Sequence, residues 1–209
     1  MLAAVALLLA PGVAAAQTVR IGSKNFTEQF IIAEIYAAAL ENAGLKVERR
    51  INLGGTLIAQ KAIETGEIDI YPEYTGTALV AVLKAPVKSN PQEVFTQVKE
   101  YYEKNFALTW LKPANINNGY AMIVRADTAA TYHLKTLSDL GAASKQLVMG
   151  AGPEFLDRQD GLPGLKGTYG VEFKEFKQFA KLGLRYDALA AKQIDVANGF
   201  ATDWQIAEQ

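Results

Sequence analysis

The chain has 209 residues, of which 50% are hydrophobic and 21% are charged, a composition typical of a folded globular protein. Lys and Arg number 21 against 22 Asp and Glu, so no overall charge would attract nucleic acid. Cysteine is absent and His133 is the single histidine, which excludes disulfides and thiolate sites and disfavours histidine metal centres and Ser-His catalysis. We therefore expect no metal, no other cofactor, no nucleic-acid partner and no enzymatic activity.

The first 16 residues form an apolar run that ends in small residues, Ala14 to Ala16, before Gln17. This pattern predicts a secretory signal peptide at residues 1–16 with an A-x-A cleavage site, and the run is too short to cross a bilayer as a mature helix. The basic segment that usually opens such a signal is missing, so we expect the natural start to lie upstream. No cysteine follows the cleavage site to carry a lipid anchor. We expect a periplasmic protein.

From Thr18 onward, expected strands alternate with expected helices, which predicts an α/β fold with parallel strands. In the first helix Asn25 is expected to be the N-cap, with Glu28 completing a capping box, and Gly44 is expected to end the helix. Its buried stripe is predicted to be Ile31, Ile35 and Ala38. The strands expected in this half are residues 18–21, 46–51, 68–71 and 107–111, and the helices are 25–43, 56–65, 78–83 and 92–105.

The composition changes near residues 117–119, where we place a boundary between two lobes. We expect a first lobe at residues 17–118 and a second at residues 119–209. The last predicted helix is still running at Gln209, and nothing after the boundary returns to the first lobe, so we expect a missing C-terminal part. The strands expected in the second half are residues 120–125, 147–150, 171–173 and 194–197, and the helices are 137–140, 182–191 and 202–208.

The stretch Ile68–Thr77 is the most informative part of the chain. Pro72 ends the predicted strand, which places Tyr74 and Thr77 where the next helix begins. Ligands of α/β proteins bind at the carboxyl ends of strands and at helix N-termini. Residues 63–70 also align without a gap with residues 189–196, which favours two similar lobes facing one cleft. The alternative is chance similarity between two αβ units.

Three polar side chains are candidates for holding an anion. Lys24 follows a strand and precedes a helix N-terminus, where a cation and free N–H groups together attract negative charge. The alternative is a solvated surface lysine. Thr77 offers a hydroxyl donor, unless it is an ordinary helical threonine. Arg158 lies in a loop with three acidic neighbours and either holds a ligand carboxylate in a bidentate manner or pairs with those acids.

Four tyrosines lie at or beside the expected ends of strands and helices: Tyr71, Tyr74, Tyr120 and Tyr186. A cluster of rings suits a ligand cation that cannot donate hydrogen bonds, because the π faces attract charge without needing N–H groups. The alternative is that each ring packs independently.

Four motifs occur in order along the chain: GSKNFTEQ at 22–29, YPEYTGT at 71–77, NNGY at 117–120 and EFLDRQDG at 154–161. Together they resemble the glycine betaine/choline/carnitine substrate-binding proteins of osmoprotectant ABC transporters. The resemblance implies a type II periplasmic-binding-protein fold, in which two α/β lobes close on a ligand. It also implies delivery of that ligand to a membrane permease driven by a cytoplasmic ATPase.

The resemblance also implies roles for particular residues. A tyrosine box for the quaternary ammonium group matches Tyr74, Tyr120 and Tyr186. A carboxylate clamp matches the three polar candidates, and Asn118 matches a polar cleft position. The family's usual Thr-Asp-Gly is Thr-Asp-Trp here, so Trp204 departs from the pattern. The residues expected to bind ligand are therefore Lys24, Tyr74, Thr77, Asn118, Tyr120, Arg158 and Tyr186.

The sequence thus predicts a periplasmic binding protein that captures a quaternary ammonium compatible solute. Within this interpretation, the clamp would favour betaine or carnitine over choline, which has no carboxylate. One alternative is a ligand-binding domain fused to a permease or a sensor. Another is a binding protein for a different small polar solute, and a periplasmic enzyme is the third, disfavoured because the sequence offers no nucleophile–base pair.

Overall fold

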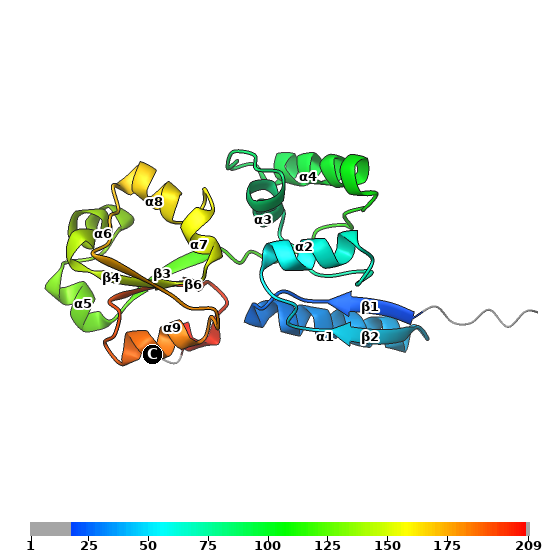
Figure 1. Cartoon of the computed structure of the whole chain (residues 1–209), viewed down its shortest axis with the longest axis horizontal. Coiled ribbons are helices and arrows are strands. Elements are labelled where there is room, and N and C mark those ends of the chain that lie inside the picture. The colour runs from blue at the N-terminus through cyan, green and yellow to red at the C-terminus, as the bar shows by residue number, and fades with distance from the viewer. Residues whose placement is uncertain (1–17, 208–209) are drawn as a thin grey trace, which may run out of the picture.

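The structure is a computed structural model that describes residues 18–207. The predicted signal peptide and the end of the last predicted helix lie outside the described residues. The described elements form two α/β groups that lie side by side, each around its own sheet (Figure 1). We call residues 18–118 lobe 1 and residues 119–207 lobe 2, and the boundary itself stays a prediction. Between residues 18 and 207, no helix is both long and apolar enough to cross a membrane.

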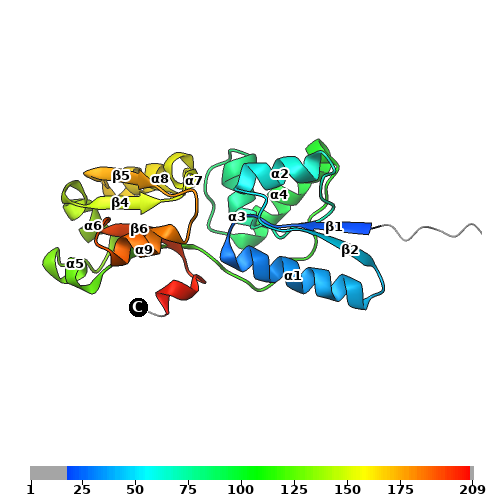
Figure 2. The same ribbon diagram turned by 60° about the horizontal axis from the view of Figure 1, so that its bottom comes forward.

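Lobe 1 is built on the parallel pair β1 and β2, whose register runs from Thr18 opposite Lys46 to Gly22 opposite Arg50. The predicted strand at 68–71 contributes one bridge, between Ile70 and Ile21. Helices α1 and α2 cover opposite faces of this sheet (Figures 1 and 2). The elements of lobe 1 are β1 (Thr18–Gly22), α1 (Thr27–Asn42), β2 (Lys46–Arg50), α2 (Thr56–Glu64), α3 (Thr75–Thr77), the π-helical turn η1 (Ala78–Val82) and α4 (Pro91–Phe106).

Helix α1 forms where the sequence predicts it, but its predicted buried face is wrong. Ile31 and Ile35 are both 59% exposed and Ala38 is exposed too, whereas the buried face carries Ile32, Ala33 and Ala37. Apolar residues surround this helix on nearly every side, so periodicity offers little contrast and contact with the sheet decides the face. The capping-box prediction is also wrong, because the N-cap is Phe26 without a side-chain cap. Gly44 follows the helix with a φ of +86°, the left-handed conformation that commonly ends a helix, as predicted.

The strand predicted at 107–111 is absent from the described structure. Ala107 is the left-handed C-cap of α4, with a φ of 55°, and the following residues to 119 have no regular structure. Leu108 and Trp110 pack instead against a helical cluster, so burial on helices and not strand pairing accounts for their apolar character. The buried members of that cluster are Ala78, Leu79, Val94, Val98 and Tyr102.

Lobe 2 contains a four-stranded sheet in the order β3-β6-β4-β5. Strand β4 is parallel to both of its neighbours, while β3 is antiparallel to β6. Helix α9 lies on one face of the sheet and helices α6 and α8 lie on the other (Figures 1 and 2). The elements are β3 (Tyr120–Val124), α5 (Ala126–Thr131), α6 (Leu137–Ala143), η2 (Ser144–Gln146), β4 (Val148–Ala151), α7 (Glu154–Asp157), α8 (Leu162–Tyr169), β5 (Glu175–Gln178), α9 (Leu184–Ala190), β6 (Val196–Phe200) and η3 (Trp204–Ile206).

Two further predictions in lobe 2 are wrong. The strand predicted at 171–173 lies further along the chain, as β5. The prediction misplaced it because Val171 is buried after the end of α8 without being in a strand, and the mixed charges around it blur the strand period. The helix predicted at 202–208 is, within the described residues, only the short 3₁₀ turn η3.

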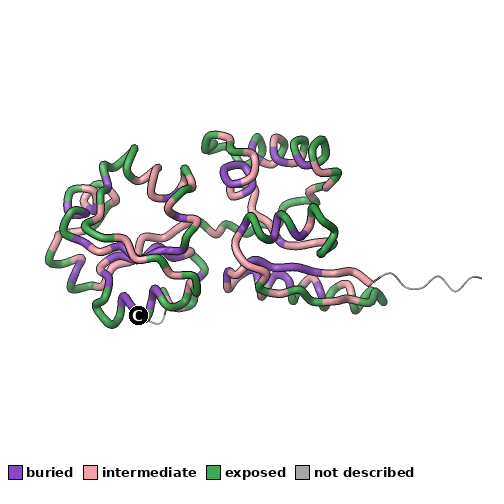
Figure 3. Tube along the Cα trace, in the orientation of Figure 1, coloured by how far each residue is buried: buried purple, intermediate pink, exposed green. Residues whose placement is uncertain are grey.

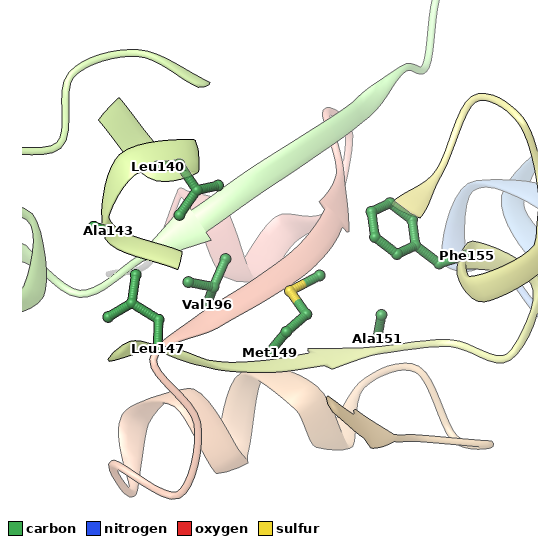
Figure 4. Packing of buried hydrophobic residues seen from close by; sticks show 7 residues of the cluster. All are labelled: Leu140, Ala143, Leu147, Met149, Ala151, Phe155 and Val196. Carbon is green, nitrogen blue, oxygen red and sulfur yellow. The ribbon is translucent and has the colours of Figure 1, made fainter. Parts of the chain in front are cut away.

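Lobe 2 has a core cluster between its sheet and helix α6 and a second one under helix α9. Leu147, Met149 and Val196 are fully buried, and Met149 pairs with Val196 across β4 and β6 (Figure 4). Within this lobe the buried residues are concentrated on β4, β6, α6 and α9, whereas β3 and β5 carry none (Figure 3).

Replacing Met149 with alanine is expected to lower the free energy of unfolding by about 2–5 kcal/mol, because a rigid core leaves a cavity where the side chain was. Urea unfolding followed by circular dichroism measures the change. Leu184, which is 48% exposed on α9, provides the control, since its replacement by alanine should cost clearly less. Equal losses in the two variants would contradict the packing described here.

Candidate functional site

A cavity of about 870 Å³ is lined by residues of both lobes and of the segment that joins them. Of the seven predicted ligand-binding residues, the structure brings five to this cavity, and the two that do not line it are Lys24 and Tyr186. The predicted residues in the lining are Tyr74, Thr77, Asn118, Tyr120 and Arg158, and the lining also contains Phe26 and Phe200.

Aromatic rings from the two lobes meet in this lining. Phe26, the N-cap of α1, lies with its ring centroid 4.9 Å from that of Phe200 at the end of β6. On lobe 2 the Phe200 ring stacks on Tyr120 at 5.6 Å, with an angle of 24° between the ring planes. The Tyr120 ring also contacts Phe155 edge-on, with 5.2 Å between the ring centroids. An aromatic surface therefore crosses from one lobe to the other.

Tyr74 joins the same lining from lobe 1, where it follows the strand-ending Pro72 and precedes α3. Its backbone N–H donates to Glu73 at 2.6 Å and its hydroxyl donates to Glu28 at 2.7 Å. Burial, helped by the bond to Glu28, raises the pKa of the Tyr74 hydroxyl. Burial also raises the pKa of Tyr120 to about 12. Both phenols therefore stay protonated at neutral pH.

Arg158 follows α7 and reaches across to lobe 1. Its Nη2 lies 3.4 Å from the hydroxyl of Thr77, and its guanidinium carbon lies 5.5 Å from the centroid of the Tyr120 ring. Two bonds of 2.8 and 2.6 Å join the guanidinium to the carboxylate of Asp160. The structure thus brings Thr77 and Arg158 together, and it also shows the pairing with an acidic neighbour that the sequence left open.

Lys24 takes a different position from the other two members of the predicted clamp. It is fully buried, and its ammonium forms an ion pair with Glu73, itself 5% exposed. The ammonium lies 4.8 Å from the centroid of the Tyr74 ring and 5.0 Å from that of Phe26. Burial lowers the pKa of Lys24, while Glu73 opposes that shift. The interpretation as a solvated surface lysine is wrong, and the charge of Lys24 is already neutralised beneath two rings of the site.

Tyr186 is 3% exposed, and its hydroxyl donates to Asp203 at 2.6 Å. Arg185 pairs with the same carboxylate at 3.0 Å and stands 5.1 Å from the centroid of the Phe200 ring. These residues therefore lie behind the aromatic lining and contact it through Phe200.

Sequence reasoning missed Phe26 and Phe200 because it considered tyrosines alone. The signal was present, since Phe26 lies inside the first motif and Phe200 falls opposite Tyr74 when the alignment of residues 63–70 with 189–196 is continued. Asn118, from the joining segment, accepts a hydrogen bond from the backbone N–H of Thr202 at 3.3 Å. Its amide is therefore tied to lobe 2.

Two α/β lobes with an aromatic cavity and an arginine between them define a two-lobed ligand-binding protein. Residues 17–209 match the family described as the substrate-binding domain of the ABC-type glycine betaine transport system, and the chain belongs to this family. The family consists of extracellular or periplasmic substrate-binding proteins and not of enzymes.

Individual relatives agree with this assignment. The chain is 36% identical over 191 residues to a carnitine transport binding protein from Listeria monocytogenes, covering 90% of this chain and 62% of the relative. It is 33% identical over 189 residues to an ergothioneine transport permease/ergothioneine binding protein from Helicobacter pylori, covering 90% of this chain and 34% of the relative. The chain thus spans less than two thirds of either relative.

A solved structure of a glycine betaine/carnitine/choline ABC transporter is 31% identical, with a TM-score of 0.64, and the match covers 91% of this chain and 71% of that one. The predicted periplasmic-binding-protein fold is confirmed, and so is the resemblance found in the four motifs.

Proposed function

We propose that the protein captures a quaternary ammonium compatible solute, such as glycine betaine, choline or carnitine, in the periplasm. It then delivers the solute to the permease subunit of an ABC transporter for osmoprotectant uptake. The observation that carries the proposal is the meeting of aromatic rings from both lobes beside Arg158 and Thr77.

The rings suit the cationic end of such a ligand. A quaternary ammonium group has no N–H to donate, and the faces of Phe26, Tyr74, Tyr120 and Phe200 attract positive charge without needing one. Each desolvated ring contributes about 0.5–2 kcal/mol. Together with one charge-assisted hydrogen bond of about 1.5–3 kcal/mol, this approaches the roughly 8 kcal/mol of micromolar binding.

Arg158 and Thr77 suit the other end of the ligand, where glycine betaine and carnitine carry a carboxylate. A guanidinium holds a carboxylate with two parallel hydrogen bonds. Arg158 already bonds in this way to the two carboxylate oxygens of Asp160. Lys24 has a supporting role in this proposal: its buried ion pair fixes Glu73 and so the start of the segment that carries Tyr74. The amide of Asn118 completes the polar side of the cavity.

A ligand that touches both lobes favours the closed conformation, since it gains contacts there that the open form lacks. The permease would recognise this closed form. The Helicobacter pylori relative supports a second candidate, because its name joins a permease and a binding protein in one chain. Fractionation of cells that express the full-length gene distinguishes a free binding protein from one fused to a permease. Recovery in the periplasmic fraction would contradict the fused arrangement.

Calorimetric titration with glycine betaine, choline, carnitine and ergothioneine tests the ligand class. We expect saturable binding of at least one ligand with micromolar affinity, reduced at least about tenfold by Tyr74→Ala, because that change removes one desolvated ring. Tyr101→Ala is the control, since Tyr101 is exposed on α4 and does not line the cavity. A folded protein that binds none of the four ligands would contradict the proposal.

A further inference from the structure

Helix α2 of lobe 1 has no side-chain cap of its own. Its N-cap residue is Gly55, and the first residue of the helix, Thr56, is fully buried. The cap comes from Glu154 in α7 of lobe 2. One carboxylate oxygen of Glu154 accepts a hydrogen bond from the backbone N–H of Thr56, and the other accepts from the Thr56 hydroxyl at 2.9 Å.

The fit between this carboxylate and the helix is close. A Cβ atom on Gly55 would overlap the carboxylate of Glu154, so any other residue at this position would displace the carboxylate from its present place. The negative charge meets the positive end of the helix dipole and free N–H groups of its first turn. Figures 1 and 2 show α7 on the side of lobe 2 that faces lobe 1.

The same carboxylate also contacts the arginine of the binding site. Arg158 lies one turn after Glu154, and its Nη1 is 3.5 Å from the carboxylate oxygen that Thr56 contacts through its hydroxyl. Arg158 in turn reaches Thr77 on lobe 1. Helix α7 and the residue that follows it therefore make two contacts across the lobes: Glu154 contacts the start of α2, and Arg158 contacts Thr77 at the end of α3.

We propose that Glu154 is a positioning residue, which couples closure of the lobes to the placement of Arg158 through its bond to the N-terminus of α2. This inference rests on the proposed function. In the closed form the carboxylate caps α2 and holds Arg158 opposite Thr77. When the lobes separate, the helix N-terminus and the carboxylate both return to water. The bond therefore raises the fraction of closed protein, and with it the apparent affinity for every ligand.

The absence of cysteine allows the opening to be measured directly. Spin labels placed by Glu100→Cys on lobe 1 and Gly167→Cys on lobe 2 report the distance between the lobes by pulsed electron paramagnetic resonance; Glu100 is exposed and Gly167 has open space around its Cα. Glu154→Ala is expected to shift the distances toward the open form. Asp157→Asn, an equal loss of charge on an exposed residue of the same helix, should leave them unchanged.

Affinity provides the second measurement. Glu154→Ala should weaken ligand binding by about 2- to 30-fold, the range that the loss of a helix N-cap typically produces. Choline and glycine betaine should be affected alike, because closure is common to the two ligands. Glu154→Gln keeps an acceptor oxygen but loses the charge, so its effect should be smaller, and it replaces the alanine variant if that variant fails to fold. A purely structural role would lower the melting temperature without changing the distances.

Wild-type distances and wild-type affinity in Glu154→Ala would overturn the proposal. If the wild-type protein binds none of the ligands, the proposed function fails, but the distances in the unliganded protein still decide the role of Glu154. Unchanged distances would then overturn it, and a shift toward the open form would support it.

Discussion

Replacing Arg158 with alanine is expected to weaken glycine betaine binding by about 10- to 100-fold and choline binding by less than about threefold. The difference follows from the ligands, because only glycine betaine has a carboxylate to form charge-assisted hydrogen bonds, worth about 1.5–3 kcal/mol. The Arg158 side chain is 10% exposed, so water replaces the lost contacts poorly. Calorimetric titration of the variant with both ligands measures the two ratios.

Two further variants make this comparison specific. Arg158→Lys keeps the charge but not the planar pair of donors, so it should recover only part of the glycine betaine affinity. Arg49→Ala removes an arginine that pairs with Glu34 and Glu41 on the exposed surface of lobe 1, and it should bind both ligands as the wild type does. Equal losses for glycine betaine and choline in Arg158→Ala would contradict the role given to this residue.

Replacing Phe200 with alanine is expected to weaken binding of every quaternary ammonium ligand by about 10- to 30-fold. The change removes one desolvated ring, worth up to about 2 kcal/mol. It also leaves the rings of Tyr120 and Phe26 without the neighbour against which both pack. Fluorescence or calorimetric titration with choline, which lacks a carboxylate, isolates the contribution of the ring.

Tyr186→Phe provides the matched control for this prediction, since it removes only the hydroxyl that donates to Asp203. We expect lower stability but nearly unchanged affinity, because Tyr186 lies outside the cavity lining. Phe200→Tyr should keep most of the affinity, since the ring is preserved. A strong loss of affinity in Tyr186→Phe with none in Phe200→Ala would contradict this arrangement and favour the tyrosine box expected from the sequence.

Much of the fold could be predicted from the sequence because its signals are local. Pro72 and Gly44 end their elements by backbone restrictions that act within a few residues. The alternation of strands and helices is likewise a property of short windows. At residues 107–111 the prediction failed because a short apolar run packs on helices, and no local pattern distinguishes such a run from a strand. At residues 171–173 it failed because charged residues among the apolar ones blur the strand period.

The candidate site could be predicted only in part. The motifs indicated Tyr74, Thr77, Asn118, Tyr120 and Arg158. Tyr74, Thr77 and Tyr120 lie at the ends of elements that the sequence locates, whereas Arg158 was expected in a loop. They did not indicate Phe200, whose part in the lining depends on the stacking of β6 beside β3.

The sequence by itself determined an α/β chain, its family and five of the residues that line the cavity. Only the tertiary structure decided that Lys24 is neutralised by Glu73, 49 residues away, and that Glu154 caps a helix of the other lobe, 98 residues away. Sequence patterns report the conformation of neighbouring residues. Pairing between distant charges depends on which elements pack together, and that is set by the burial of the whole chain.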